Sequence, residues 1–176
     1  GSLAPGVAKN FWARAACIAK SQGARIVLDS THGVSECLEE SLYLLRMNKH
    51  DINAFAGRTV DWPEETARVA SKLVGKGQAT KVVVTHGGDG ALLVRAGGVA
   101  RAPGLDVPIA SAVGAGDSFV AALLVALLRG ERDETALRYA MAAASATLTT
   151  PGTALFDPAT VEQLFTAPAN YSAGSR

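Results

Sequence analysis

The sequence predicts an α/β protein in which helices flank a mostly parallel β-sheet. Helical and strand patterns alternate along the 176 residues, an order typical of layered α/β folds. Several apolar runs are short and bounded by glycine or polar residues, as buried strands are. One of these runs leads directly into a glycine-rich segment, and ligands of parallel sheets bind beyond the carboxyl ends of the strands. We therefore expect a layered fold with a ligand site at one edge of the sheet.

The first four elements follow from local pattern. Apolar residues recur at helical spacing over residues 7–20, and Gly23 marks the end of that helix. The short apolar run at 25–29 predicts a strand whose carboxyl end delivers an acidic and a hydroxyl side chain. Residues 35–41 favour a helix, and residues 42–45 favour a buried strand.

The middle of the chain continues the alternation. Residues 48–55 favour a short helix that Gly57 stops. Pro63 is followed by two acidic residues, the usual start of a helix, and this helix is expected to run to about residue 74. Residues 81–85 contain three consecutive valines and predict another strand.

The last part of the chain is expected to be a hairpin and then a run of helices. Residues 91–95 and 99–101 predict two strands that turn across Gly97-Gly98. The tail after Ala167 is small and polar, so we expect it to be frayed. The three helices expected between hairpin and tail cover residues 116–128, 133–147 and 157–165.

The composition is that of a soluble globular protein. Hydrophobic residues make up 48% of the chain and charged residues 19%, and no linker interrupts it, so we expect one domain across residues 1–176. The net charge of +1 gives no reason to expect nucleic acid or a membrane as partner. The longest apolar run, residues 119–128, is ten residues long, too short to cross a bilayer. Cys17 and Cys37 follow no metal-binding spacing, which predicts reduced thiols in a cytoplasmic protein.

The most informative segment is Gly114-Ala115-Gly116-Asp117, which precedes a long apolar stretch. The glycines allow a tight turn, and the amides at the start of the following helix would point at a bound anion. Asp117 stands at the positive end of that helix, where it can accept a proton from a substrate hydroxyl. We therefore assign Asp117 as a general base and the amides of Gly114, Ala115 and Gly116 as stabilisers of a transferred phosphoryl group. The alternative is a glycine-rich turn in which Asp117 only caps the helix.

Two better-known phosphate-binding motifs are excluded. A Walker A loop ends in Gly-Lys-Ser or Gly-Lys-Thr, and the chain contains neither. A dinucleotide-binding motif needs a third glycine where this sequence has Phe119. The segment thus favours phosphoryl transfer by another type of protein.

Further candidate residues follow the predicted strands. Asn48 and Asp51 are three apart, so on a helical turn they share a face and could hold Mg²⁺, Asp51 through water. The alternative is that Asn48 caps a helix and Asp51 is an ordinary first-turn acid. The rule for strand ends places these residues on one rim: Asn48, Asp51, Thr85, Gly87, Gly90 and Asp117.

Five segments, in order, make the chain similar to the ribokinase-type sugar kinases, in their phosphofructokinase B branch. The resemblance covers essentially the whole chain. The segments are G-S-L-A-P-G-V at 1–7, R-M-N-K-H-D at 46–51 (K-P-N-x-x-E in the family), V-V-V-T-H-G-G-D-G-A at 82–91, G-A-G-D at 114–117 and A-A-A-S-A-T at 142–147.

The resemblance implies a ribokinase-like fold of which this chain is the C-terminal, nucleotide-binding and catalytic part, with the N-terminal part missing. It implies ATP and Mg²⁺ as cofactors. Arg46 stands where the family has Lys and would contact phosphate, and Thr85, Gly87 and Gly90 would lie beside the nucleotide. Met141 and Ser145 would lie near the adenine, although core packing explains them equally well. Ser2 would contact the phosphate of the sugar.

The resemblance also implies a carbohydrate kinase that converts fructose 6-phosphate to fructose 1,6-bisphosphate. Fructose 1-phosphate, tagatose 6-phosphate or another sugar stay open as substrates. A different class stays open as well, a nucleotide-binding module without catalysis. The expected partners are a sugar phosphate and a second copy of the chain in a homodimer.

Overall fold

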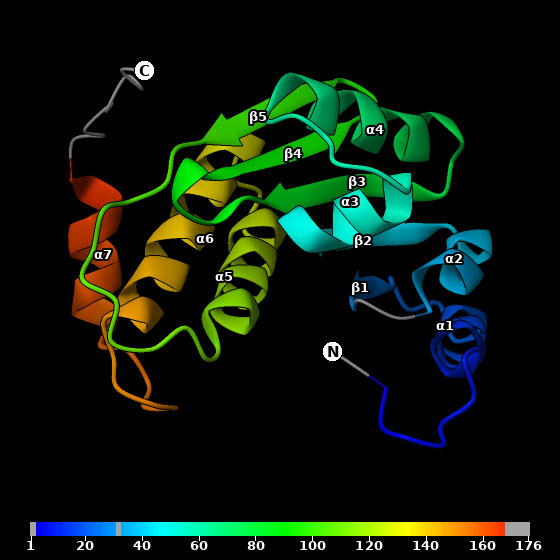
Figure 1. The fold of residues 1–176 in the computed structure, drawn as a ribbon, viewed down its shortest axis with the longest axis horizontal. Helices are drawn as coiled ribbons and strands as arrows, with labels where there is room; N and C mark the ends of the chain where they lie inside the picture. The colour runs from blue at the N-terminus through cyan, green and yellow to red at the C-terminus, as the bar shows by residue number, and fades with distance from the viewer. Residues whose placement is uncertain (1–2, 31–32, 168–176) are drawn as a thin grey trace. The chain divides into compact units, whose positions relative to one another are not determined.

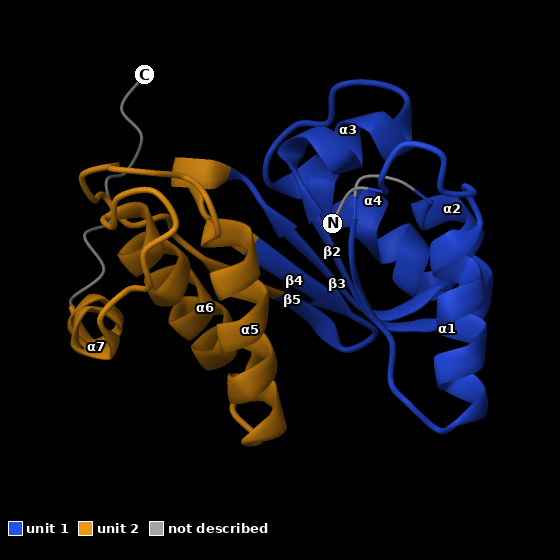
Figure 2. Ribbon diagram, turned by 90° about the horizontal axis from the view of Figure 1, so that it is seen from below, with its two compact units in different colours: residues 1–86, 92–99 blue, residues 87–91, 100–176 orange. Residues whose placement is uncertain are grey.

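The computed structural model describes residues 3–30 and 33–167. These residues divide into two compact units (Figure 2). Unit 1 comprises residues 1–86 and 92–99, and unit 2 comprises residues 87–91 and 100–176. Ser2, expected at the sugar phosphate, and the tail beyond Ala167 lie outside the described residues.

The expected α/β class is confirmed, and the described residues form a sheet of five strands in the order β1-β2-β3-β4-β5 (Figure 1). The pairs β1–β2 and β2–β3 are parallel. Only Ala96 and Gly97 separate β4 from β5, and strands joined so closely can only be antiparallel, as the predicted hairpin requires. The strands are β1 (Val27–Asp29), β2 (Leu42–Asn48), β3 (Ala79–Thr85), β4 (Ala91–Arg95) and β5 (Gly98–Ala102).

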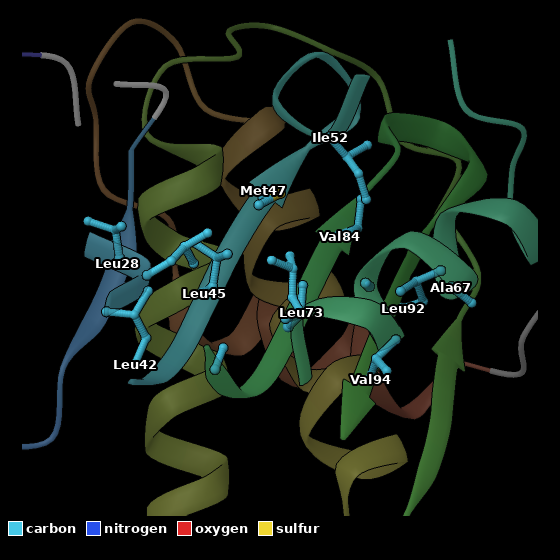
Figure 3. Packing of buried hydrophobic residues seen from close by; sticks show 14 of the residues in the cluster. Leu28, Leu42, Leu45, Met47, Ile52, Ala67, Leu73, Val84, Leu92 and Val94 are labelled. Carbon is cyan, nitrogen blue, oxygen red and sulfur yellow. The ribbon is translucent and has the colours of Figure 1, made fainter. Parts of the chain in front are cut away.

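Among its described residues, unit 1 contains four helices and a 3₁₀ turn. They pack on one apolar cluster to which the strands also contribute. Figure 3 shows part of this cluster, with Leu42, Leu45 and Met47 along β2 and Ile52 from the third helix beside Val84 from β3. These elements are α1 (Phe11–Ser21), α2 (Val34–Cys37), η1 (Leu38–Glu40), α3 (Lys49–Ala56) and α4 (Glu64–Gly75).

The two cysteines of the chain are both free thiols. Cys17 is exposed on α1, whereas Cys37 is fully buried in the apolar cluster. Burial, together with the neighbouring carboxylates Glu36 and Glu40, raises the pKa of the Cys37 thiol. That thiol therefore packs as a small apolar group.

Unit 2 is mainly helical. Its helices are α5 (Ala115–Leu128), α6 (Asp133–Leu148) and α7 (Pro158–Thr166), and the 3₁₀ turn η2 (Gly87–Asp89) also belongs to it. α5 packs on α6, and α6 on α7, as Figure 2 shows in orange. Alanines such as Ala136, Ala140 and Ala143 are fully buried on α6, so the helices can approach closely. Within residues 3–30 and 33–167, every helix is too short or too polar to cross a membrane.

Several predicted boundaries differ from the structure. The first helix begins at Phe11 rather than at residue 7, because the chain turns at Gly6, whose φ is +85°. The expected helix at 35–41 is one α-helical turn followed by η1, which Ser41 ends with a φ of +55°. The strand expected at 42–45 extends to Asn48. That last difference matters most, because it places Arg46 on a strand and Asn48 at its end.

Candidate functional site

Arg46 connects the carboxyl ends of three parallel strands in unit 1. Its Nη1 donates to Asp29 Oδ1 at 3.1 Å, and its Nη2 donates to Thr85 Oγ1 at 2.8 Å. The side chains of Arg46 and Asp29 are 13% and 26% exposed. The structure thus brings together Arg46 and Thr85, two residues predicted to contact the nucleotide.

Asp29 was predicted only as a residue at a strand end, without a role in the site. The parallel register sets Asp29 of β1 beside Arg46 of β2. A carboxylate beside a half-buried guanidinium offsets its charge and holds it in one orientation. The signal in the sequence was an acid and a base at the ends of successive apolar strands, which becomes informative only when the register is known.

Asn48 and Asp51 form a capping box at the start of α3. Asn48 Oδ1 accepts from the amides of His50 and Asp51 at 2.8 and 2.9 Å, and Asp51 Oδ2 accepts from the amide of Asn48 at 2.9 Å. The capping role that the sequence left open is therefore real. A role at a metal stays a prediction beside it.

Asp51 also faces a surface pocket of about 190 Å³ in unit 1, together with Glu36, Ser35 and Phe55. Among the described residues, no group of three or more His, Cys, Asp or Glu side chains is placed to hold a metal ion. Mg²⁺ that travels with a nucleotide needs only one or two protein carboxylates, since phosphates and water complete its shell. The oxygen donors of Asn48 and Asp51 fit that requirement.

In unit 2, the glycine-rich segment forms the turn that opens α5. Gly114 is the residue before the helix and has a φ of +80°, a conformation that favours glycine. Asp117 lies in the first helical turn and is exposed. The Ala115 amide makes a long contact of 3.4 Å with the carbonyl of Ala112, and the Ser118 amide donates to Gly114 O at 2.9 Å. A carboxylate and the amides of a first helical turn therefore share one short segment, as the sequence predicted.

Gly87 and Gly90 bound the turn η2, also in unit 2. Both have positive φ, +60° and +106°, and the amide of Gly90 donates to Gly87 O at 3.1 Å. The backbone of this turn lies directly against the segment after β5. A Cβ added to Gly104 would overlap the carbonyl oxygen of Gly88, and one added to Gly90 would overlap that of Ala102. Only glycine fits at positions 90 and 104, because a side chain at either would overlap the backbone of the other segment.

Met141 and Ser145 lie on α6 and are 7% and 2% exposed. Met141 lines a small hollow of about 20 Å³ with Pro103, Leu105 and Leu164. A hollow of that size holds about one water molecule. Core packing, the alternative weighed from the sequence, accounts for both side chains, and contact with an adenine stays a prediction.

The family comparison covers almost the whole chain. A family model described as pfkB family carbohydrate kinase matches residues 1–160. The chain is 34% identical over 165 residues to ATP-dependent 6-phosphofructokinase isozyme 2 of Mycobacterium tuberculosis, covering 94% of this chain and 49% of that protein. It is 34% identical over 148 residues to 1-phosphofructokinase of Escherichia coli K12, covering 82% of this chain and 46% of that protein. The chain thus spans about half the length of the curated relatives it matches.

The chain is also similar in structure to solved sugar kinases. Phosphofructokinase-2 from Escherichia coli, in complex with substrates and products, superposes with a TM-score of 0.86 at 30% identity, over 94% of this chain and 54% of that one. Ribokinase from Arabidopsis thaliana, complexed with ribose and ATP, superposes with a TM-score of 0.78 at 24% identity, over 95% of this chain and 55% of that one. The second likeness concerns the fold alone, and it confirms the expected ribokinase-like class.

Proposed function

The chain belongs to the pfkB family of carbohydrate kinases, and from this premise we propose that it is the nucleotide-binding and catalytic part of an ATP-dependent sugar-phosphate kinase. The observation that carries the proposal is Asp117, exposed in the first turn of α5 just after the left-handed Gly114. Phosphoryl transfer needs a base for the attacking hydroxyl and donors for the charge on the moving phosphoryl group. The segment 114–117 provides both within one turn.

In the proposed reaction, Asp117 accepts the proton of a sugar hydroxyl while the hydroxyl oxygen attacks the γ-phosphorus of ATP. The bond between that phosphorus and the bridging oxygen breaks, and ADP leaves. The amides of Gly114, Ala115 and Gly116 donate to the phosphoryl oxygens as negative charge spreads over them. Catalysis is then positioning plus electrostatic stabilisation.

In unit 1, Arg46 is the proposed contact for a phosphate of the nucleotide, with Asp29 and Thr85 fixing its orientation. Asn48 and Asp51 would hold Mg²⁺, Asp51 through water. The metal supplies positive charge that screens the triphosphate from the incoming hydroxyl. Gly87 and Gly90 would let the backbone approach the nucleotide, and Met141 and Ser145 would lie near its base.

Fructose 6-phosphate is the proposed substrate, because the match to a 6-phosphofructokinase covers 94% of this chain at 34% identity. Fructose 1-phosphate is the second candidate, because the 1-phosphofructokinase of Escherichia coli K12 also matches at 34% identity, over 82% of this chain. Tagatose 6-phosphate, another sugar, and a non-catalytic nucleotide-binding role are further alternatives. We place the protein in the cytoplasm, with a homodimer as the proposed assembly.

The test is ATP consumption by the protein of the full open reading frame, with a panel of sugars. The panel is fructose 6-phosphate, fructose 1-phosphate, tagatose 6-phosphate and ribose. Turnover with fructose 6-phosphate at the highest kcat/KM would support the first choice. A higher kcat/KM with another member would reassign the substrate, and calorimetric binding of ATP without any turnover would favour the non-catalytic module.

A further inference from the structure

The segment that leads into α5 is bound to the carboxyl end of α6. The amides of Ala110 and Ser111 both donate to the carbonyl of Leu148, at 2.8 and 3.3 Å. The Ser111 hydroxyl donates to Gly152 O at 2.9 Å, and the Val113 amide donates to that hydroxyl at 3.2 Å. The chain is thus fixed up to the residue before Gly114. These hydrogen bonds end at Val113 and do not include the turn that follows.

Thr147, on the last turn of α6, contacts this turn at both of its ends. Its Oγ1 lies 2.7 Å from the hydroxyl of Ser118, the residue after Asp117. Its methyl group lies beside Gly114, since a Cβ built there would meet Thr147 Cγ2 at 3.8 Å. Thr147 itself is 5% exposed, so the contact is shielded from water.

The hydroxyls of Thr147 and Ser118 can be assigned as acceptor and donor in the hydrogen bond between them. Thr147 Oγ1 also lies 3.0 Å from the carbonyl oxygen of Ala143, one helical turn earlier. A hydroxyl has a single proton, and a carbonyl oxygen can only accept. When the Thr147 hydroxyl donates to Ala143 O, its oxygen is free to accept from the Ser118 hydroxyl. Ser118 is therefore held by a residue whose own orientation is fixed by its helix.

We infer that Thr147 is a positioning residue for the turn 114–118, acting through Ser118 on its neighbour Asp117. The inference rests on the proposed function, since it gives the turn a catalytic purpose. Asp117 is exposed, and a general base must keep within hydrogen-bond reach of the hydroxyl that it deprotonates. A displacement of about 1 Å at such a group can cost about 100-fold in rate. A part-buried hydroxyl pair one residue away limits that displacement.

The test compares Thr147→Val with the wild type in the full-length protein. Valine keeps the shape and the methyl group but removes the hydroxyl. We expect kcat to fall by roughly 10- to 100-fold, with the KM for ATP changed by less than about twofold. Thr147→Ser keeps the hydroxyl and should restore kcat to within about threefold of the wild type. Thr149→Val is the matched control, because the Thr149 hydroxyl donates to Ala146 O within α6 and touches neither Gly114 nor Ser118 in the hydrogen bonds described, and its kcat should stay unchanged.

Amide hydrogen exchange provides a readout that does not need activity. The Ser118 amide bonds to Gly114 O, so its exchange reports on the turn. We expect Thr147→Val to speed its exchange by roughly fivefold, the equivalent of one ordinary hydrogen bond, and Thr149→Val to leave it unchanged. Ser118→Ala should act like Thr147→Val, and the double variant should add little to either.

Unchanged exchange at Ser118 in Thr147→Val would overturn the inference. So would faster exchange with an unaltered kcat, because the contact would then serve the fold alone. If the wild type turns over no sugar of the panel, it is the proposed function that fails. The exchange data still decide whether Thr147 fixes the turn.

Discussion

Asp117 is the residue on which the proposed chemistry depends most directly. Replacing it with asparagine keeps the size of the side chain but removes its ability to accept a proton. We expect Asp117→Asn to lower kcat by roughly 10²- to 10⁴-fold while ATP still binds. Steady-state kinetics and calorimetry with ATP check the two halves of this prediction. An unchanged kcat would show that Asp117 is not the base; the N-cap of α5 is Gly114, and no side-chain hydrogen bond caps this helix.

Asp51 has two roles to separate, since it caps α3 and is proposed to act at Mg²⁺. Asp51→Asn keeps an oxygen that can accept from the Asn48 amide but loses the negative charge. We expect the stability to change by less than about 0.5 kcal/mol and the Mg²⁺ concentration for half-maximal activity to rise by about tenfold or more.

A matched control for Asp51 is Asp157→Asn. Asp157 caps α7 and accepts from the amide of Ala159 at 2.9 Å. It has no proposed role at a metal, so the Mg²⁺ dependence of this variant should equal that of the wild type. An unaltered Mg²⁺ dependence in Asp51→Asn would leave Asp51 with its capping role alone.

The start of α4 carries a pH-dependent contact. Glu65 accepts hydrogen bonds from the Arg58 guanidinium and from the Asp61 amide, and these lower the pKa of its carboxyl to about 2. Because this pKa is lower in the folded than in the unfolded chain, Glu65 stabilises the fold above about pH 4.5. That contribution is lost progressively as the pH falls toward about 2.

Glu65→Gln removes the charge of this side chain and so tests its contribution. The urea midpoints of the wild type and Glu65→Gln should differ most at pH 5–7 and converge as the pH is lowered to about 2. Glu162→Gln, on α7, is the control and should follow the wild type throughout. Curves for Glu65→Gln that stay parallel to the wild type over this range would contradict the assigned cause.

The close contact between η2 and the segment after β5 predicts that a side chain at position 104 destabilises the fold. Gly104→Ala would drive a methyl group into the Gly88 carbonyl, and neither backbone can yield cheaply. We expect the free energy of unfolding to fall by about 1–3 kcal/mol. Gly75→Ala, at the end of α4, meets no atom within 4 Å and should be neutral or stabilise by up to about 1 kcal/mol. Urea denaturation of both variants checks this, and equal midpoints would rule out the close approach.

Local pattern predicted those elements whose limits are set by local chemistry. Gly114 and the apolar run after it fixed the start of α5 to within one residue, because a left-handed glycine and a helix start are both local properties. The end of β2 was missed by three residues because Arg46 and Asn48 are polar. Arg46 can lie on the strand because Asp29 of β1 and Thr85 of β3 accept hydrogen bonds from its guanidinium. These contacts depend on the register of the strands, which local sequence pattern does not contain.

At the scale of the whole molecule, the division into two units was not predictable from composition. The sequence contains no linker, and β4 and β5 each contribute residues to both units. The proposed site residues are likewise distributed, with Arg46, Asn48 and Asp51 in unit 1 and Gly114 to Asp117 in unit 2. The predicted rim, which would join these groups, remains a prediction for a complex with nucleotide to test.

The length of the chain relative to its relatives leads to the last prediction. It spans 49% of ATP-dependent 6-phosphofructokinase isozyme 2 of Mycobacterium tuberculosis. The resemblance to the family also implies that most sugar-contacting residues lie in the N-terminal part, outside the matched half. We therefore expect this chain alone to bind ATP with Mg²⁺, whereas only the protein of the full open reading frame turns over fructose 6-phosphate. The loss in the short form should be at least about 10³-fold in kcat/KM, because the sugar would no longer be held for attack. Calorimetry measures ATP binding, and a coupled assay measures turnover of fructose 6-phosphate, for residues 1–176 and for the full-length protein. Asp117→Asn in the full-length protein gives the background rate. Equal turnover by the short chain would mean that residues 1–176 hold the sugar themselves, and the search for its contacts would then begin at the surface pocket beside Asp51.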